Sequence, residues 1–222
     1  KYLLHVLIIS FIFLLAPTAH VTLHAGAIED AKEEVRKNPD DAKAHFYLGN
    51  AYQIAGKYKE AIEACKRAIK INPDYRDAHF KLGYAYGESG KYQEAIESCK
   101  QAIRIDPDYA KAHNNLGNAY GKSGKYKEAI KSFKQAIRLD PDYAKAHYNL
   151  GVAYGKSGKY QEAIESCKQA IRIDPDYSSA HFGLGLAYHL SNDRDSALEQ
   201  YKILKNLGSE LANDLFNEIY RE

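Results

Sequence analysis

Apolar and polar positions along this chain recur with a period of 34 residues. A Leu-Gly pair, one variable residue and an Ala-Tyr pair return five times in the same frame, with the glycine at Gly49, Gly83, Gly117, Gly151 and Gly185. A fixed period of this length is typical of one supersecondary unit that is stacked many times. The chain is therefore predicted to be a repeat protein rather than a globule with one central core.

Each unit contains two amphipathic segments with helical spacing. His45, Leu48 and Tyr52 lie at i, i+3 and i+7 and share one face of a first helix. Ile62 and Cys65 begin the apolar face of a second helix in the same unit. The pattern indicates an all-α chain built from pairs of helices.

Glycine and proline mark the ends of these helices. Glycines stand between the first and second helix, where a helix often ends in a left-handed residue, at Gly56, Gly90, Gly124 and Gly158. Prolines, which cannot continue a helix, follow the second one at Pro73, Pro107, Pro141 and Pro175. The frame glycines let the two helices approach closely, and a larger side chain there is expected to cost about 1–3 kcal/mol.

Residues 42–207 closely resemble five tetratricopeptide repeats. The matching pattern is an aromatic residue, Leu-Gly and Tyr on the first helix, then Ala, an aromatic and Ala on the second, then Pro. The resemblance implies a right-handed superhelical solenoid of helix-turn-helix repeats, with a concave groove that binds protein partners. It also implies a protein interaction scaffold rather than an enzyme.

The segments that flank the repeats are predicted to be caps. Residues 28–41 match only a second helix and form a polar half repeat, as a terminal repeat should. The fifth repeat departs from the pattern, with Asn192 in place of the turn glycine. In residues 208–222, a narrow apolar stripe predicts a capping helix and contains Leu211, Leu215, Phe216 and Ile219.

Residues 1–27 differ in kind from the repeats. Leu3–Ala16 is an apolar run after Lys1, and Ala25-Gly26-Ala27 supplies a small-x-small site, which is the layout of a secretory signal peptide. The run is about 21 Å long as a helix, short for a hydrocarbon core of about 30 Å. We expect an exported chain: periplasmic, extracellular or membrane-anchored. If the segment is retained, membrane contact is expected through these residues alone, unless a second chain covers them.

The family's groove positions are carried over to this sequence as candidate partner-binding residues. They are Phe46, Asn50, Phe80, Tyr84, Asn114, Asn118, Tyr148, Val152, Phe182 and Leu186, with Lys111 and Lys145 on the rim. Gly87, Gly121 and Gly155 fall on the same side. These three glycines either leave room for a second chain or persist from recent duplication, and the sequence leaves both alternatives open.

Three further sets of residues recur at one repeat position each. Cys65, Cys99 and Cys167 are interpreted as buried thiols; the alternatives are an intermolecular disulfide or a reactive or metal-binding role. His45, His79, His113, His147 and His181 are interpreted as packing residues with one ring nitrogen hydrogen-bonded; they lie too far apart to share a metal. Tyr75, Tyr109, Tyr143 and Tyr177 are expected to pack over the helix junctions or to form an exposed aromatic row.

No catalytic motif is present, and no cofactor or metal is expected. The net charge of +2, from 31 basic and 29 acidic residues, is not the footprint of a nucleic-acid binder. The expected partner is a protein segment. The alternative is a structural subunit that forms a homo-oligomer or filament. The chain starts with an unpaired second helix and ends with a helix in the position of a first helix, so two chains joined head to tail would complete a further repeat. Glu34 and Ile219 fit that joint poorly.

Overall fold

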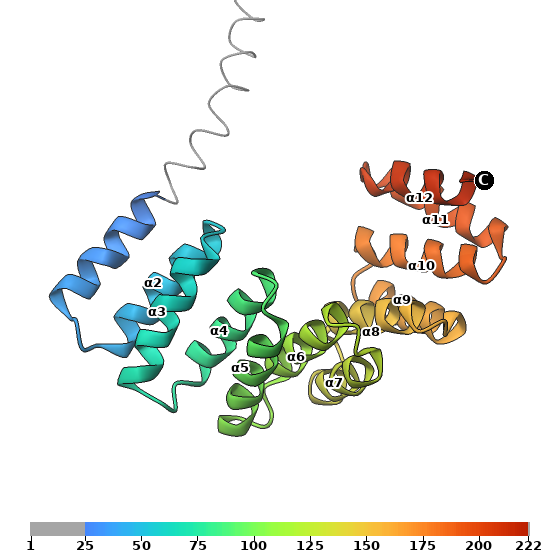
Figure 1. Ribbon diagram of the computed structural model, residues 1–222. Helices are drawn as coiled ribbons and strands as arrows, with labels where there is room; N and C mark the ends of the chain where they lie inside the picture. Colours follow the sequence, from blue (N-terminus) through green and yellow to red (C-terminus); the bar gives the residue numbers. More distant parts are fainter. Residues whose placement is uncertain (1–24, 222) are drawn as a thin grey trace, which may run out of the picture. The chain divides into compact units, whose positions relative to one another are not determined.

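A computed structural model describes residues 25–221 of the chain, and these residues are helical with short connections (Figure 1). The first described helix covers residues 25–37. The others are α2 (Ala42–Ile54), α3 (Tyr58–Ile71), α4 (Arg76–Glu88), α5 (Tyr92–Ile105), α6 (Ala110–Lys122), α7 (Tyr126–Leu139), α8 (Ala144–Lys156), α9 (Tyr160–Ile173), α10 (Ser178–Leu190), α11 (Arg194–Asn206) and α12 (Leu211–Tyr220). The predicted all-α solenoid of helix pairs is confirmed. None of the helices in the described range is long and apolar enough to span a membrane.

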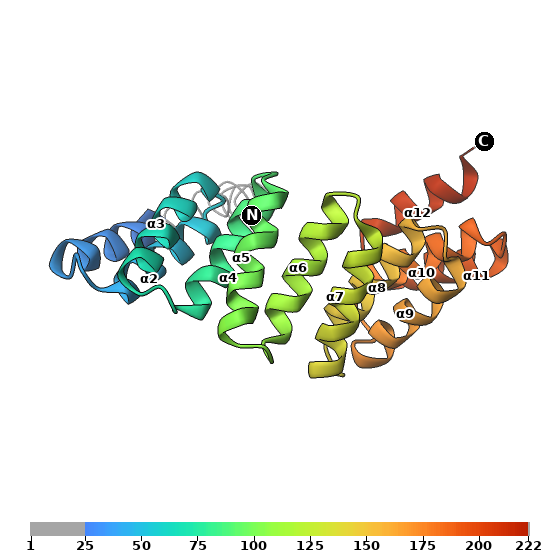
Figure 2. The same ribbon diagram turned by 60° about the horizontal axis from the view of Figure 1, so that its bottom comes forward.

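The helices group into two compact units, which divide between Ile105 and Asp106. In the first unit, α2 pairs with α3 and α4 pairs with α5. In the second, the pairs are α6 with α7, α8 with α9 and α10 with α11, and α12 follows them. Figure 2 shows these pairs as neighbouring ribbons within each unit. The helices thus pair as the 34-residue period predicts.

The turn inside each pair is a glycine-dependent helix stop. Gly56 has φ +70°, and the N–H groups of Gly56 and Lys57 donate to the carbonyls of Gln53 and Tyr52. Because these two bonds close the last turn, the chain leaves α2 in a left-handed residue and reverses into α3. Asn192, which replaces the turn glycine in the fifth repeat, takes the same conformation with φ 65°. Asparagine is among the few residues that tolerate this region.

In the first four repeats, the frame glycine lies in close contact with the second helix of its own pair. A Cβ atom added to Gly83 would lie 2.7 Å from Cys99 Sγ and 3.3 Å from the Ala95 carbonyl oxygen. Cys99 is fully buried. Gly117 contacts the ring of Phe133 in the same way. The second helix can therefore lie against the first only because this position has no side chain.

A histidine closes the corner between successive repeats. The Nε2 atom of His79 lies 2.8 Å from the carbonyl oxygen of Pro73, six residues earlier. The same bond forms in all five repeats, with distances between 2.8 and 3.0 Å. The proline thus ends the second helix while its carbonyl accepts a bond from the next first helix. The predicted role of the histidines as hydrogen-bonded packing residues is confirmed.

The last helix does not repeat the geometry of the first helices. Leu215 is fully buried, and its methyl groups lie against Gly185, where the other repeats place the Cys or Phe of their own second helix. Tyr201, the equivalent of those residues, stacks instead on Phe216 at 5.4 Å. The helix α12 therefore packs on both α10 and α11 and fills their core, rather than beginning a regular sixth repeat.

Candidate partner-binding surface

In the first unit, three of the four predicted groove positions, Phe46, Asn50 and Phe80, are half-buried, and two of them contact other side chains of the same unit. The centroid of the Phe46 ring lies 5.1 Å from that of Tyr75, the corner tyrosine that ends the same repeat. The Nζ atom of Lys81 donates to Oδ1 of Asn50 at 2.6 Å. Tyr84 is 39% exposed. Phe80 lies one turn before it on α4 and is half-buried. The carboxamide of Asn50 is therefore partly engaged within the chain.

In the second unit, Asn114 lies in the interior and not on the predicted partner-binding surface. Its side chain is only 1% exposed, and its Oδ1 accepts a hydrogen bond of 3.0 Å from Nδ2 of Asn149. Asn149 comes from α8, the next first helix, and α8 packs on α7 beside it. The aromatic residues at the same position of the other repeats are half-buried instead: Phe46, Phe80, Tyr148 and Phe182.

Three further predicted positions of the second unit, Tyr148, Phe182 and Leu186, are also partly covered. The ring of Tyr148 stacks edge-on against Tyr177 at 5.4 Å. Burial, followed by the nearby Tyr148 hydroxyl, raises the pKa of Tyr177 to about 12. Phe182 and Leu186 pack against the buried cluster that contains Leu215. Tyr75 and Tyr177 thus pack over the helix junctions, as predicted. All four corner tyrosines are half-buried.

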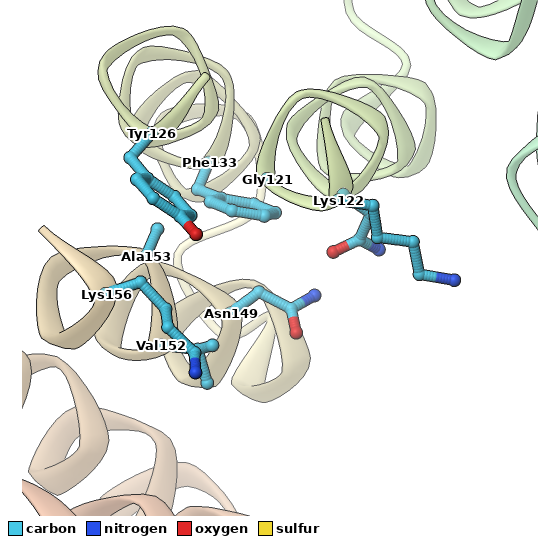
Figure 3. A pocket seen from close by; sticks show the side chains of 9 residues that line it. Gly121, Lys122, Tyr126, Phe133, Asn149, Val152, Ala153 and Lys156 are labelled. Carbon is cyan, nitrogen blue, oxygen red and sulfur yellow. The ribbon is translucent and has the colours of Figure 1, made fainter. Parts of the chain in front are cut away.

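A hollow of about 270 Å³ lies between α6, α7 and α8 (Figure 3). The residues from α6 are Asn118, Gly121 and Lys122. The rings of Tyr126 and Phe133 face the hollow from α7, and Asn149, Val152, Ala153 and Lys156 line it from α8. Two predicted groove positions, Asn118 and Val152, therefore meet at one site. The other predicted positions do not line this hollow.

The sequence analysis missed several residues of this hollow. Lys122 and Lys156 lie one helical turn after Asn118 and Val152, so an i, i+4 extension of the predicted groove positions would have found them. Asn149 is adjacent to Tyr148 and belongs to a neighbouring face of α8. Tyr126 and Phe133 come from a second helix, which the carried-over pattern does not include. No signal within the first helices points to these two aromatic residues.

Comparison with known proteins decides the family. Profiles of the tetratricopeptide repeat match residues 31–63, 49–90, 88–124, 122–158 and 144–177. The chain belongs to the tetratricopeptide repeat family.

Solved structures of tetratricopeptide proteins agree with this assignment. MamA is 30% identical over 79% of this chain and 98% of its own, with a TM-score of 0.63. TTC0263 from Thermus thermophilus is 27% identical over 80% and 96%, with a TM-score of 0.66. YrrB, described as having an unusual peptide-binding site, is 20% identical over 86% and 100%, with a TM-score of 0.64, and shows the fold alone. No curated protein matches the chain.

The cysteines of these tetratricopeptide repeats are structural. Cys65, Cys99 and Cys167 are buried and free, so the predicted core thiols are confirmed. Burial raises the pKa of each thiol to about 12. Because the thiolate is the reactive form, a thiol that keeps its proton at neutral pH is a poor nucleophile. Within the described range, no group of three His, Cys, Asp or Glu residues could hold a metal ion.

The three glycines near the predicted groove are not needed for packing within a repeat. A Cβ atom on Gly121 would approach only the Cβ of Ala129, at 3.9 Å, and Gly87 and Gly155 have the same surroundings. This distance is an ordinary van der Waals contact, so alanine fits at each position. Gly121 lines the hollow. The glycines are therefore compatible with a second chain at this surface.

Proposed function

We propose that the chain is a non-enzymatic scaffold that binds a segment of a partner protein at the groove positions of its first helices. Tetratricopeptide proteins are generally scaffolds for protein interactions, and family membership supports the same role here. The observation that carries the proposal is the hollow between α6, α7 and α8. There, two groove positions, Asn118 and Val152, meet two rings of α7.

The chemistry of the hollow suits a peptide. Carboxamides can both donate to and accept from a peptide group, and Asn118 and Asn149 present two of them. Aromatic residues anchor protein interfaces; Tyr126 supplies a half-buried ring next to those amides, and the buried ring of Phe133 forms the floor beneath it. Most functional interfaces combine an apolar centre with a polar rim. The hollow has both in one place.

The alternative function, a head-to-tail polymer, gains no support from the last helix. Such a joint requires α12 to receive the second helix of another copy at Ile219. Ile219 is 2% exposed and packs in a cluster with Leu204 and Leu215 of its own chain. This end is closed by its own core, so the scaffold is the function that the geometry supports best.

We also propose that the chain is exported. The proposal rests on the apolar run Leu3–Ala16, which lies outside the described residues. Ala25, Gly26 and Ala27 are exposed at the start of the described helix, where they are accessible to a peptidase. Mass spectrometry of the native N-terminus tests this. A mature chain that begins near residue 28 supports export by a cleaved signal, and an intact soluble chain in the producing cell contradicts it.

Site-specific photo-crosslinking tests the binding surface. A photoreactive phenylalanine analogue at Val152, which is 38% exposed, should form an adduct with the partner. The same analogue at Lys131, an exposed residue of α7 outside the hollow, is the control. Asn118→Ala should lower the adduct yield at position 152. Equal adducts at both positions, or a partner that co-purifies but crosslinks only at 131, would show that the groove is not the binding surface.

A further inference from the structure

The charged side chains that line the hollow between α6, α7 and α8 are all positive. Lys122 and Lys156 are its only ionisable side chains besides the phenol of Tyr126, and no carboxylate lines it. The two lysines occupy the same helix position in consecutive repeats. The other repeats have Ile54, Glu88 and Leu190 there. The positive charge is therefore a property of this hollow and not of the repeat.

Lys156 is available to a ligand. No ion pair or hydrogen bond joins its ammonium group to any residue in the described range, and its side chain is exposed. Figure 3 shows its side chain extending beside Val152. An ammonium group in this position attracts an anionic group that enters next to Val152.

The amide groups retain capacity for a partner. Asn149 uses its Nδ2 to donate to Asn114, but no residue of the described chain donates to its Oδ1. The side chain of Asn118 makes no hydrogen bond within the described chain. One peptide group can therefore bond to both carboxamides, since each of them offers a donor and an acceptor.

The size and floor of the hollow restrict the ligand further. Its volume of about 270 Å³ is below the range of pockets that hold whole drug-sized ligands, roughly 300–1,000 Å³. Phe133 and Val152 make the interior apolar, and Gly121 leaves space above Ala129. The hollow therefore fits one or two side chains of a longer chain rather than a complete cofactor.

We infer that this hollow recognises a protein segment in which an Asp or Glu residue is adjacent to an apolar residue. The apolar side chain lies against Val152 and the ring of Tyr126, the peptide group bonds to Asn118 and Asn149, and the carboxylate lies near Lys122 and Lys156. This inference rests on the proposed scaffold function and defines the class of segment that the scaffold binds.

Selection of random peptides displayed on phage against the full-length chain tests the inference. Enriched peptides should contain an acidic residue next to an apolar one, and their affinity should fall as salt is raised, because salt screens exposed charges. Lys156→Glu should lower the affinity of the chain for the synthetic peptides about tenfold, since it places a like charge opposite the carboxylate. Lys131→Glu changes the net charge equally, lies outside the hollow and should leave affinity unchanged.

The outcomes separate this inference from the function on which it rests. Peptides that bind and perturb the amide NMR signals of Val152, but are not acidic or bind Lys156→Glu as well as the wild type, overturn the inference and leave the scaffold function standing. Peptides that bind without perturbing Val152 or Asn149 contradict the site itself. If no peptide is retained by the full chain, the groove-binding function fails and the inference fails with it.

Discussion

At the scale of single residues, the fold depends on positions where a side chain is missing. Gly83 has space for a hydrogen only, because Cys99 Sγ would lie 2.7 Å from a Cβ atom. Gly87, one turn later on α4, has space for a methyl group, since its nearest neighbour is the Ala95 Cβ at 3.9 Å. Packing therefore requires a glycine at position 83 but not at position 87.

The glycine pair gives a matched test. Gly83→Ala should destabilise the chain by about 1–3 kcal/mol, because overpacking outweighs the gain in helix propensity. Gly87→Ala should instead stabilise it by up to about 1 kcal/mol, because alanine is the better helix former and fits. Urea unfolding followed by circular dichroism measures both. Equal shifts of the two variants would mean that the contact with Cys99 does not limit this position.

The buried thiols predict a dependence on alkaline pH. Burial raises the pKa of Cys99 to about 12, whereas the thiol of an unfolded chain has a pKa of about 8.5. Below that lower value both states hold the proton and the contribution to stability is complete. Above it, only the unfolded state ionises, so the contribution is lost as the pH rises toward the folded pKa, by about 1.4 kcal/mol per pH unit.

Comparison with Cys99→Ala isolates this effect. The difference in unfolding free energy between the wild type and the variant should be constant from pH 6 to about pH 8 and should then decrease with pH. Urea titrations across this range measure it at each pH. A difference that stays constant up to pH 10 would indicate that the Cys99 thiol is accessible to solvent in the folded chain.

At the scale of helices, the fifth repeat is completed by a helix from outside it. Leu215 of α12 lies against Gly185, in the place that a residue of the second helix takes elsewhere. Its neighbours in the buried cluster include Leu204 and Ile219. The end of a stacked repeat array has no next repeat to cover it, and here α12 covers it.

Truncation of this contact should loosen the end of the second unit. Leu215→Ala removes a fully buried side chain and should cost about 2–5 kcal/mol. Leu207→Ala, at a residue that is 37% exposed, should change stability by about 0.5 kcal/mol or less. Amide hydrogen exchange read in α10 and α11 reports the local effect. Unchanged protection in the Leu215 variant would show that α12 does not stabilise the fifth repeat.

At the scale of the whole molecule, each compact unit contains a buried cluster of its own. The first is centred on Cys65 and Leu82, and the second on Phe133, Leu150 and Leu184. In stacked repeats, stability is close to a sum of terms from each repeat and its neighbours. A surface of a repeat that no neighbouring helix covers is therefore where association between chains is expected.

Sedimentation of two forms of the chain tests association. A chain that lacks residues 1–24 should sediment as a monomer, because α12 buries Leu215 and Ile219 within its own chain. The chain with residues 1–24 retained should form oligomers without detergent, since the run Leu3–Ala16 offers apolar surface whose burial is favourable by roughly 25 cal/mol per Å². Oligomers of the shortened chain would favour the polymer over the scaffold.

The sequence by itself determined the features that depend on contacts within one repeat. The period predicted the helix pairs, the glycine turns and the close approach at Gly83, because each depends on residues less than one repeat apart. Tertiary structure alone decided the features that join different repeats. Asn114 is buried because Asn149, 35 residues away, bonds to it. Leu215 fills the space beside Gly185. Lys122 and Lys156 line the same hollow as two rings of α7. These contacts depend on how neighbouring helices rotate and pack, which a pattern within one helix does not encode.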